Sequence, residues 1–285
     1  MGVKIFTTKK GLNMRRIFAA LFVMATASTA WVRAQEYFPL NPGIRKHFKA
    51  TVNQNTSVGG QSAMSVTVYF RNTEEVVGQA KVYDKPAILV RTTRVDSIPG
   101  RPTDESKLSQ LIENYYQTRP QGIFLLANFN LPADTGHKPD STRYEPTLQV
   151  LKLPADSGAK WIVGTMKMQG ILVGLTGQVL GREDMETPAG SFKNCLKTKS
   201  SSTSVSGGIQ AASGLAMNVT GGEFSSISWY APGVGLVKQD VTSRFVLSSP
   251  NLPPGMSAEL SFQQNLALTK VETAPKEEKK ATNKK

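Results

Sequence analysis

Apolar and polar residues alternate with a period of two along much of the chain. From Met64 to Phe70 the even-numbered positions are apolar and the odd ones mostly polar, and a similar alternation runs through residues 48–53, 237–247 and 258–269. Successive side chains of a β-strand point to opposite faces, so this pattern is typical of antiparallel strands with one buried face. The sequence therefore predicts a mainly β protein.

Residues 104–118 have a helical period instead. Four apolar side chains are spaced as i, i+3, i+4 and i+7, which places them on one face of a helix: Leu108, Leu111, Ile112 and Tyr115. Thr103 or Asp104 provides an N-cap, and Pro120 ends the helix. A single amphipathic helix in a chain of strands has to bury its apolar stripe, so we expect it to lie against a sheet.

Two short segments predict tight turns between strands. Residues 187–190 (TPAG) have proline second and glycine fourth, as in a type I turn, and residues 231–234 (APGV) have Pro-Gly in the middle, as in type II. Residues 200–222 are rich in glycine and serine. We expect that segment to be either mobile or a loose hairpin at an edge.

The first 34 residues have the composition of an export signal. A basic start is followed by an apolar run from Ile17 to Trp31 and by small residues at Val32 and Ala34, the side chains that signal peptidase accepts. The run is shorter than the ~20 residues of a membrane-spanning helix, which disfavours an uncleaved anchor. We expect cleavage after Ala34, no further membrane span, and a periplasmic or secreted protein that is not a lipoprotein, because no cysteine lies near that site.

Beyond residues 1–34 we expect a single β-rich domain at 35–269 and a disordered Lys/Glu-rich tail at 270–285. The net charge of +13 includes six lysines and arginines in the signal and +3 in the tail, so the domain itself is near +4. Such a weak basic balance, in an exported chain, predicts no nucleic-acid partner. Cys195, the one cysteine, cannot form an internal disulfide, and its place within a strand favours a buried, inert thiol.

Three segments resemble an exported bacterial group known as the TapB-like family: YFPLNPG (37–43), GREDMETPAGSFKNCLKTKS (181–200) and WYAPGVGLVKQD (229–240). Lys46 departs from the family pattern, in which an aromatic residue commonly stands at this position, so the first strand is expected to pack differently. The resemblance implies a strongly curved antiparallel sheet, a half-barrel or open barrel similar to those of lipoprotein carriers. It implies no particular activity, because the family is uncharacterised.

The repeated phrase LPADTG (131–136) and LPADSG (153–158) contains the letters of an aspartic-protease catalytic pair. Two such carboxylates must lie about 3 Å apart. Here Pro-Ala precedes both Asp134 and Asp156, so both sit in loops, and their separation of 22 positions is too short for a protease lobe. We therefore interpret the two aspartates as turn formers and rank an aspartic-type hydrolase last. The two histidines, His47 and His137, match no known metal site, so we expect no catalytic residues, metal or cofactor.

The remaining hypotheses are non-enzymatic. The favoured one is a curved sheet that binds an apolar or lipid-like small molecule, with the predicted helix as a partial lid. Its candidate ligand-binding residues are Leu108, Leu111, Ile112, Tyr115, Trp229 and Tyr230. The alternative is a structural or assembly partner of another protein in the bacterial envelope, with residues 229–237 or 200–222 at the interface.

Overall fold

Twelve β-strands account for nearly all of the described chain. A computed structural model describes residues 36–97, 110–132, 140–168, 170–210, 216–250 and 256–273; the predicted signal at 1–34 lies outside them. The strands are β1 (Ile44–Val58), β2 (Gln61–Val82), β3 (Lys85–Ser97), β4 (Gln110–Arg119), β5 (Gly122–Pro132), β6 (Asp140–Lys152), β7 (Lys160–Met168), β8 (Ile171–Thr187), β9 (Gly190–Gln210), β10 (Ala216–Ala231), β11 (Gly235–Ser248) and β12 (Ala258–Thr273).

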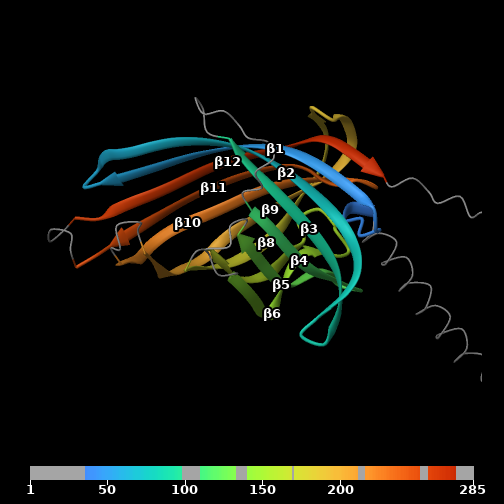
Figure 1. Cartoon of the computed structure of the whole chain (residues 1–285), viewed down its shortest axis with the longest axis horizontal. Helices are drawn as coiled ribbons and strands as arrows, with labels where there is room; N and C mark the ends of the chain where they lie inside the picture. Colours follow the sequence, from blue (N-terminus) through green and yellow to red (C-terminus); the bar gives the residue numbers. More distant parts are fainter. Residues whose placement is uncertain are drawn as a thin grey trace, which may run out of the picture.

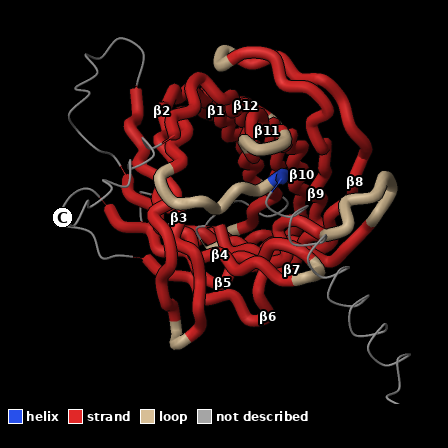
Figure 2. Tube along the Cα trace, turned by 90° about the vertical axis from the view of Figure 1, so that its right-hand side faces the viewer, coloured by secondary structure: helices blue, strands red, loops and turns tan. Residues whose placement is uncertain are grey.

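All twelve strands belong to one antiparallel sheet with the order β6-β5-β4-β3-β2-β1-β12-β11-β10-β9-β8-β7. Sequence neighbours therefore pair throughout, except that β1 pairs with β12 and leaves the consecutive strands β6 and β7 at the two edges. The sheet curls until these edges lie side by side (Figures 1 and 2). The predicted class, a strongly curved antiparallel sheet forming an open barrel, is confirmed.

Side-chain contacts close the barrel where the two edge strands meet. Among the described strands, no backbone ladder joins β6 to β7. Instead, the Trp161 indole Nε1 of β7 donates to the Gln149 carbonyl of β6 at 2.8 Å, and the Lys152 Nζ donates to the Lys160 carbonyl at 3.0 Å. We call this junction the seam.

The helix predicted at 104–118 is wrong. Residues 110–118 belong to β4, which pairs with β3 on one side and β5 on the other, and the rest of the segment lies outside the described residues. All ten residues of β4 are half-buried, so neither face is fully apolar or fully polar. A strand of that kind shows no clear two-residue alternation, and a few apolar residues then match a helical period by chance.

Several other predictions can be compared with the structure directly. The alternating segments all lie in strands, in β1, β2, β11 and β12. The type II turn after Ala231 is confirmed, since Gly233 has a φ of 73° and the Val234 amide donates to the Ala231 carbonyl at 3.2 Å. The boundary of the tail needs correction: residues 270–273 pair with β1 as the end of β12, because Val271 continues the buried face opposite Lys46.

Two hydrophobic clusters dominate the core. The larger one lies inside the barrel and draws on β5–β8 and β10–β11, with Ile123, Leu151 and Val173 fully buried. The second contains Trp229 and Cys195, and the tip of the β8–β9 hairpin packs on it through Met185 and Phe192. This hairpin arches over the neighbouring strands in Figure 2. Cys195 is fully buried, as predicted.

Candidate functional site

A cavity of about 270 Å³ lies inside the barrel. Most of its wall is apolar and comes from strands far apart in the sequence. Representative lining residues are Val76 (β2), Val90 (β3), Leu148 (β6), Val163 (β7), Leu175 (β8) and Phe224 (β10). Because these positions follow the inward side of successive strands, the curl of the sheet itself creates the cavity.

A short N-terminal segment, residues 36–43, crosses one end of the barrel, and we call it the strap. It begins with a short helical segment, blue in Figure 2, that lies within the ring of strands. The Gly233 amide donates to the Glu36 carbonyl at 2.6 Å, and the Gly43 amide donates to the Val76 carbonyl at 2.9 Å. Both ends of the strap are thus held by the barrel wall. Phe38 of the strap packs edge-on against Tyr116, with ring centroids 5.2 Å apart.

One part of the cavity wall is polar. Lys46 of β1 forms an ion pair with Glu74 of β2, directly opposite it in the ladder. Their side chains are 6% and 25% exposed. A buried ion pair costs considerable desolvation energy and is weak support for stability, so its presence in a cavity is a feature to explain by function.

Hydroxyl groups on β9 and β10 form a second polar part of the wall. Thr198, Ser226 and Ser228 are each 6% exposed. The Gln239 side-chain amide donates to the Ser228 hydroxyl at 3.1 Å, whereas the Ser226 hydroxyl has no hydrogen-bond partner among the described residues. An unpaired buried hydroxyl typically costs about 1–3 kcal/mol, which a bound ligand could recover.

Three tyrosines around the cavity remain neutral phenols. Burial raises the pKa of Tyr230 and of Tyr144 above its ordinary value. Burial likewise raises the pKa of Tyr116, and the negative charge of the nearby Glu74 raises it further. The cavity therefore presents one compensated ion pair and several neutral polar groups.

The structure separates the residues predicted to bind a ligand. Tyr230 lines the cavity, but its neighbour Trp229 points away into the second cluster. The Trp229 indole donates to the Glu183 carboxylate at 2.5 Å and lies beneath the ammonium groups of Lys197 and Lys238. Trp229 therefore helps to hold the β8–β9 hairpin against the barrel.

The β4 residues are also rearranged relative to the prediction. Leu111, Ile112 and Tyr115 do not line the cavity; Tyr116 does, and Leu108 lies outside the described residues. Tyr115 instead packs edge-on against Phe129, with centroids 5.4 Å apart. Reading the segment as a helix placed the wrong side chains on the inner face.

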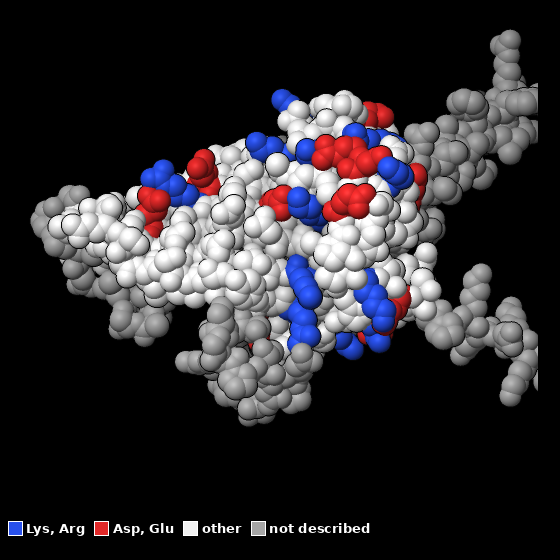
Figure 3. Space-filling view, turned by 90° about the horizontal axis from the view of Figure 1, so that it is seen from above, with Lys and Arg blue, Asp and Glu red and all other residues white. Residues whose placement is uncertain are grey.

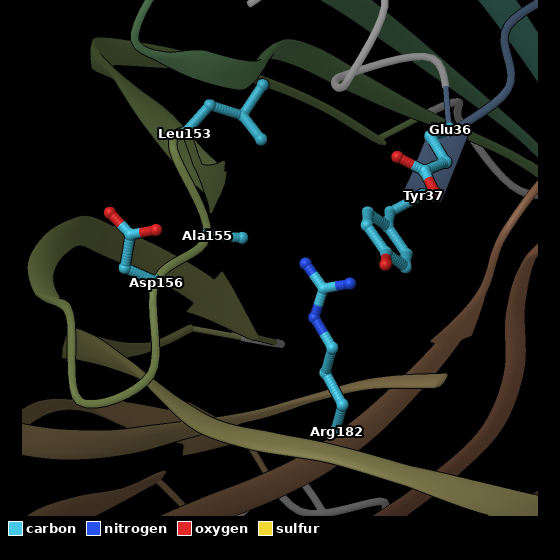
Figure 4. Close-up of a pocket in the computed structure, with 6 residues that line it drawn as sticks. All are labelled: Glu36, Tyr37, Leu153, Ala155, Asp156 and Arg182. Carbon is cyan, nitrogen blue, oxygen red and sulfur yellow. The ribbon is translucent and has the colours of Figure 1, made fainter. Parts of the chain in front are cut away.

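A second hollow of about 270 Å³ lies beside the start of the strap and is shown in Figure 4. The Arg182 guanidinium points into it from β8, 5.2 Å from the Tyr37 ring, with Glu36 and Asp156 at its margin. Asp156 is the aspartate of LPADSG, in the loop between β6 and β7. Asp134 and His137 lie outside the described residues, so the assignment of Asp134 as a turn former stays a prediction.

The described residues contain no group of three or more His, Cys, Asp or Glu side chains that could hold a metal ion. Within the same residues, no helix is long and apolar enough to cross a membrane. On the face seen in Figure 3, acidic and basic side chains are interspersed, so that face offers no field of a single sign.

No protein-family model and no curated protein matches the chain, and the TapB-like resemblance stays a prediction. Solved structures similar to it include a predicted exported protein with a YmcC-like fold from Bacteroides fragilis, with 13% identity, 84% of this chain and 99% of the other covered, and a TM-score of 0.31. Another is a predicted lipoprotein from Parabacteroides distasonis, with 13% identity, 83% and 98% covered, and a TM-score of 0.33.

A LolA superfamily protein from Nitrosomonas europaea is also similar, with 9% identity, 85% and 92% covered, and a TM-score of 0.20. At these levels of similarity neither function nor ligand transfers between the proteins. The function of this chain has to be argued from its own cavity.

Proposed function

We propose that this is an exported, non-enzymatic protein of the bacterial envelope that binds an apolar or lipid-like molecule inside its barrel. The observation that carries the proposal is the cavity inside the barrel, whose wall is mostly apolar. Ligand sites in proteins are typically concave, mostly apolar and equipped with a few fixed polar groups, and this cavity has all three properties. Export follows from the predicted signal at residues 1–34.

The size of the cavity limits the ligand. Small-molecule sites commonly measure about 300–1,000 Å³, so a cavity of about 270 Å³ is at the small end of that range. It suits one hydrocarbon chain better than two. Transfer of such a chain from water gains about 0.8 kcal/mol per buried methylene, which is sufficient for stable binding of a medium-length chain.

The first experiment is native mass spectrometry of the mature protein purified without detergent, followed by titration with an environment-sensitive naphthylamine probe. We expect a co-purifying small molecule and saturable binding of the probe. Repeated preparations that carry no small molecule and do not bind the probe would contradict the proposal. Retention of a protein partner by such empty preparations would favour the structural alternative.

A matched pair of variants on β7 tests whether binding occurs in the cavity. Val163 lines the cavity and is 6% exposed, whereas the adjacent Ile162 points to the other face and is 77% exposed. Val163→Phe should fill part of the cavity and weaken probe binding at least about tenfold, which corresponds to 1.4 kcal/mol. Ile162→Phe should leave it unchanged. Equal effects of the two variants would place the probe elsewhere.

A further inference from the structure

We propose that the cavity selects a single-chain amphiphile whose head group is polar but uncharged, such as an alcohol or a monoacylglycerol, over one with a carboxylate or phosphate head. This inference rests on the proposed function and specifies its ligand. It follows from the charge balance of the cavity wall and from the free hydrogen-bonding groups beside it.

Charge balance is the first argument. Among the described residues that line the cavity, Lys46 and Glu74 alone carry a formal charge, and they are paired with each other. The wall is therefore neutral overall. An anionic head would have to compete with Glu74 for Lys46, and it would leave one uncompensated negative charge in a poorly solvated space, which is strongly unfavourable.

The free hydrogen-bonding capacity is the second argument. A lysine ammonium has three donors, and Glu74 is its described partner. A head group with a hydroxyl or a carbonyl can accept from the remaining donors of Lys46 without disturbing the ion pair. The expected ligand thus uses hydrogen-bonding capacity that the ion pair leaves free.

The position of Lys46 also fixes an orientation. Lys46 lies next to the strap, since a side-chain Cβ built at Gly235 would be 3.1 Å from the Pro39 Cδ and 3.5 Å from the Lys46 Nζ. The apolar wall from Leu148, Val163 and Leu175 lies on strands remote from β1 in the sheet order. The head group is therefore expected beneath the strap, with the chain directed toward β6–β8.

The test is competition against the bound naphthylamine probe by three ligands with equal chains: dodecanol, monolaurin and laurate, at a pH where laurate is ionised. The wild-type protein should bind the two neutral ligands at least about tenfold more tightly than laurate. Equal binding of all three would overturn the head-group inference but leave the proposed function standing. Failure of all three to bind would overturn both.

Glu74→Gln tests the cause of the selectivity. It removes the negative charge while keeping the shape, so Lys46 becomes an unpaired cation and laurate should gain at least about tenfold in affinity. The matched control is Glu75→Gln, the adjacent residue of β2, whose partner Arg45 is 46% exposed; it should change nothing. No gain for laurate in Glu74→Gln would refute the role given to the ion pair.

Discussion

Gly177→Ala is expected to disturb the seam. Gly177 of β8 is paired with Trp161 of β7, and the indole ring lies directly over the glycine. A Cβ built at Gly177 would be 2.2 Å from Trp161 Cε2, 2.3 Å from Cζ2 and 2.8 Å from Cδ2. These distances are far below van der Waals contact, so the ring has to move. Trp161 is 8% exposed and donates to Gln149 of the opposite edge, so the movement also disturbs the closure of the barrel.

The magnitude follows from three contributions. Overpacking a well-packed site costs about 1–3 kcal/mol, and the loss of the indole hydrogen bond costs about 0.5–1.5 kcal/mol. Alanine also has less conformational freedom than glycine in the unfolded chain, and this stabilises the folded protein by about 0.4–1 kcal/mol. The free energy of unfolding should therefore fall by about 2 kcal/mol.

Urea denaturation followed by circular dichroism measures this change. Gly221→Ala in β10 is the matched control, because a Cβ there meets nothing within 4 Å; that variant should be neutral or slightly stabilised. In a Trp161→Ala background the clash is gone, so Gly177→Ala should no longer destabilise. The reasoning is refuted if Gly177→Ala matches Gly221→Ala, or if its cost persists when Trp161 is absent.

Three further predictions concern the hairpin, the thiol and the turn. The pKa of Glu183 is lowered, first by the hydrogen bond from Trp229 and then by Lys197. The ionised Glu183 carboxylate thus stabilises the folded protein at a pH above the ordinary glutamate pKa. This stabilisation is lost as the pH falls through the lowered pKa of Glu183. Glu183→Gln should be less stable than wild type near neutral pH by at most about 1 kcal/mol, because the carboxylate is 42% exposed, and the two unfolding curves should converge in acid. Cys195, whose pKa is raised by burial, should not react with Ellman's reagent until urea unfolds the protein. Gly233→Ala should cost about 1–2 kcal/mol in the same denaturation assay, because φ is 73° there.

The strands were predictable from the sequence wherever one face of the strand is buried and the other is exposed to solvent. In β1, Lys46, Phe48 and Ala50 are buried while Arg45 and Lys49 are exposed, and the sequence shows this alternation directly. β4 was not predictable, because its residues are equally half-buried on both faces. The pairing of β1 with β12 was not readable either, since its partners are at least two hundred residues apart in the sequence.

The polar wall of the cavity was missed, although part of its signal is visible in the sequence. Lys46 stands two residues before Phe48 and four before Ala50, which places it on their buried face. A lysine at such a position is normally taken to mean that the apolar face of the strand ends there. Its partner Glu74 cannot be identified from the sequence, because this requires the register between β1 and β2. Tyr230 lines the cavity, and its part in ligand binding stays a prediction. Trp229 was not separated from it, although adjacent residues of a strand must face opposite sides.

The three segments that resemble the TapB-like family serve one end of the barrel. The strap contains the first, and the Gly233 amide of the third donates to its Glu36 carbonyl. The tip of the second is fixed to β12, where the Ala189 amide donates to the Leu268 carbonyl at 3.1 Å. Gly235 has a φ of 90° and lets the strap pass close by, beside Lys46. The close approach of the strap to the barrel wall therefore explains these glycines and prolines without any catalytic role. The same approach places the strap directly beside Lys46. Any change that lifts the strap should consequently alter how a ligand's head group is held.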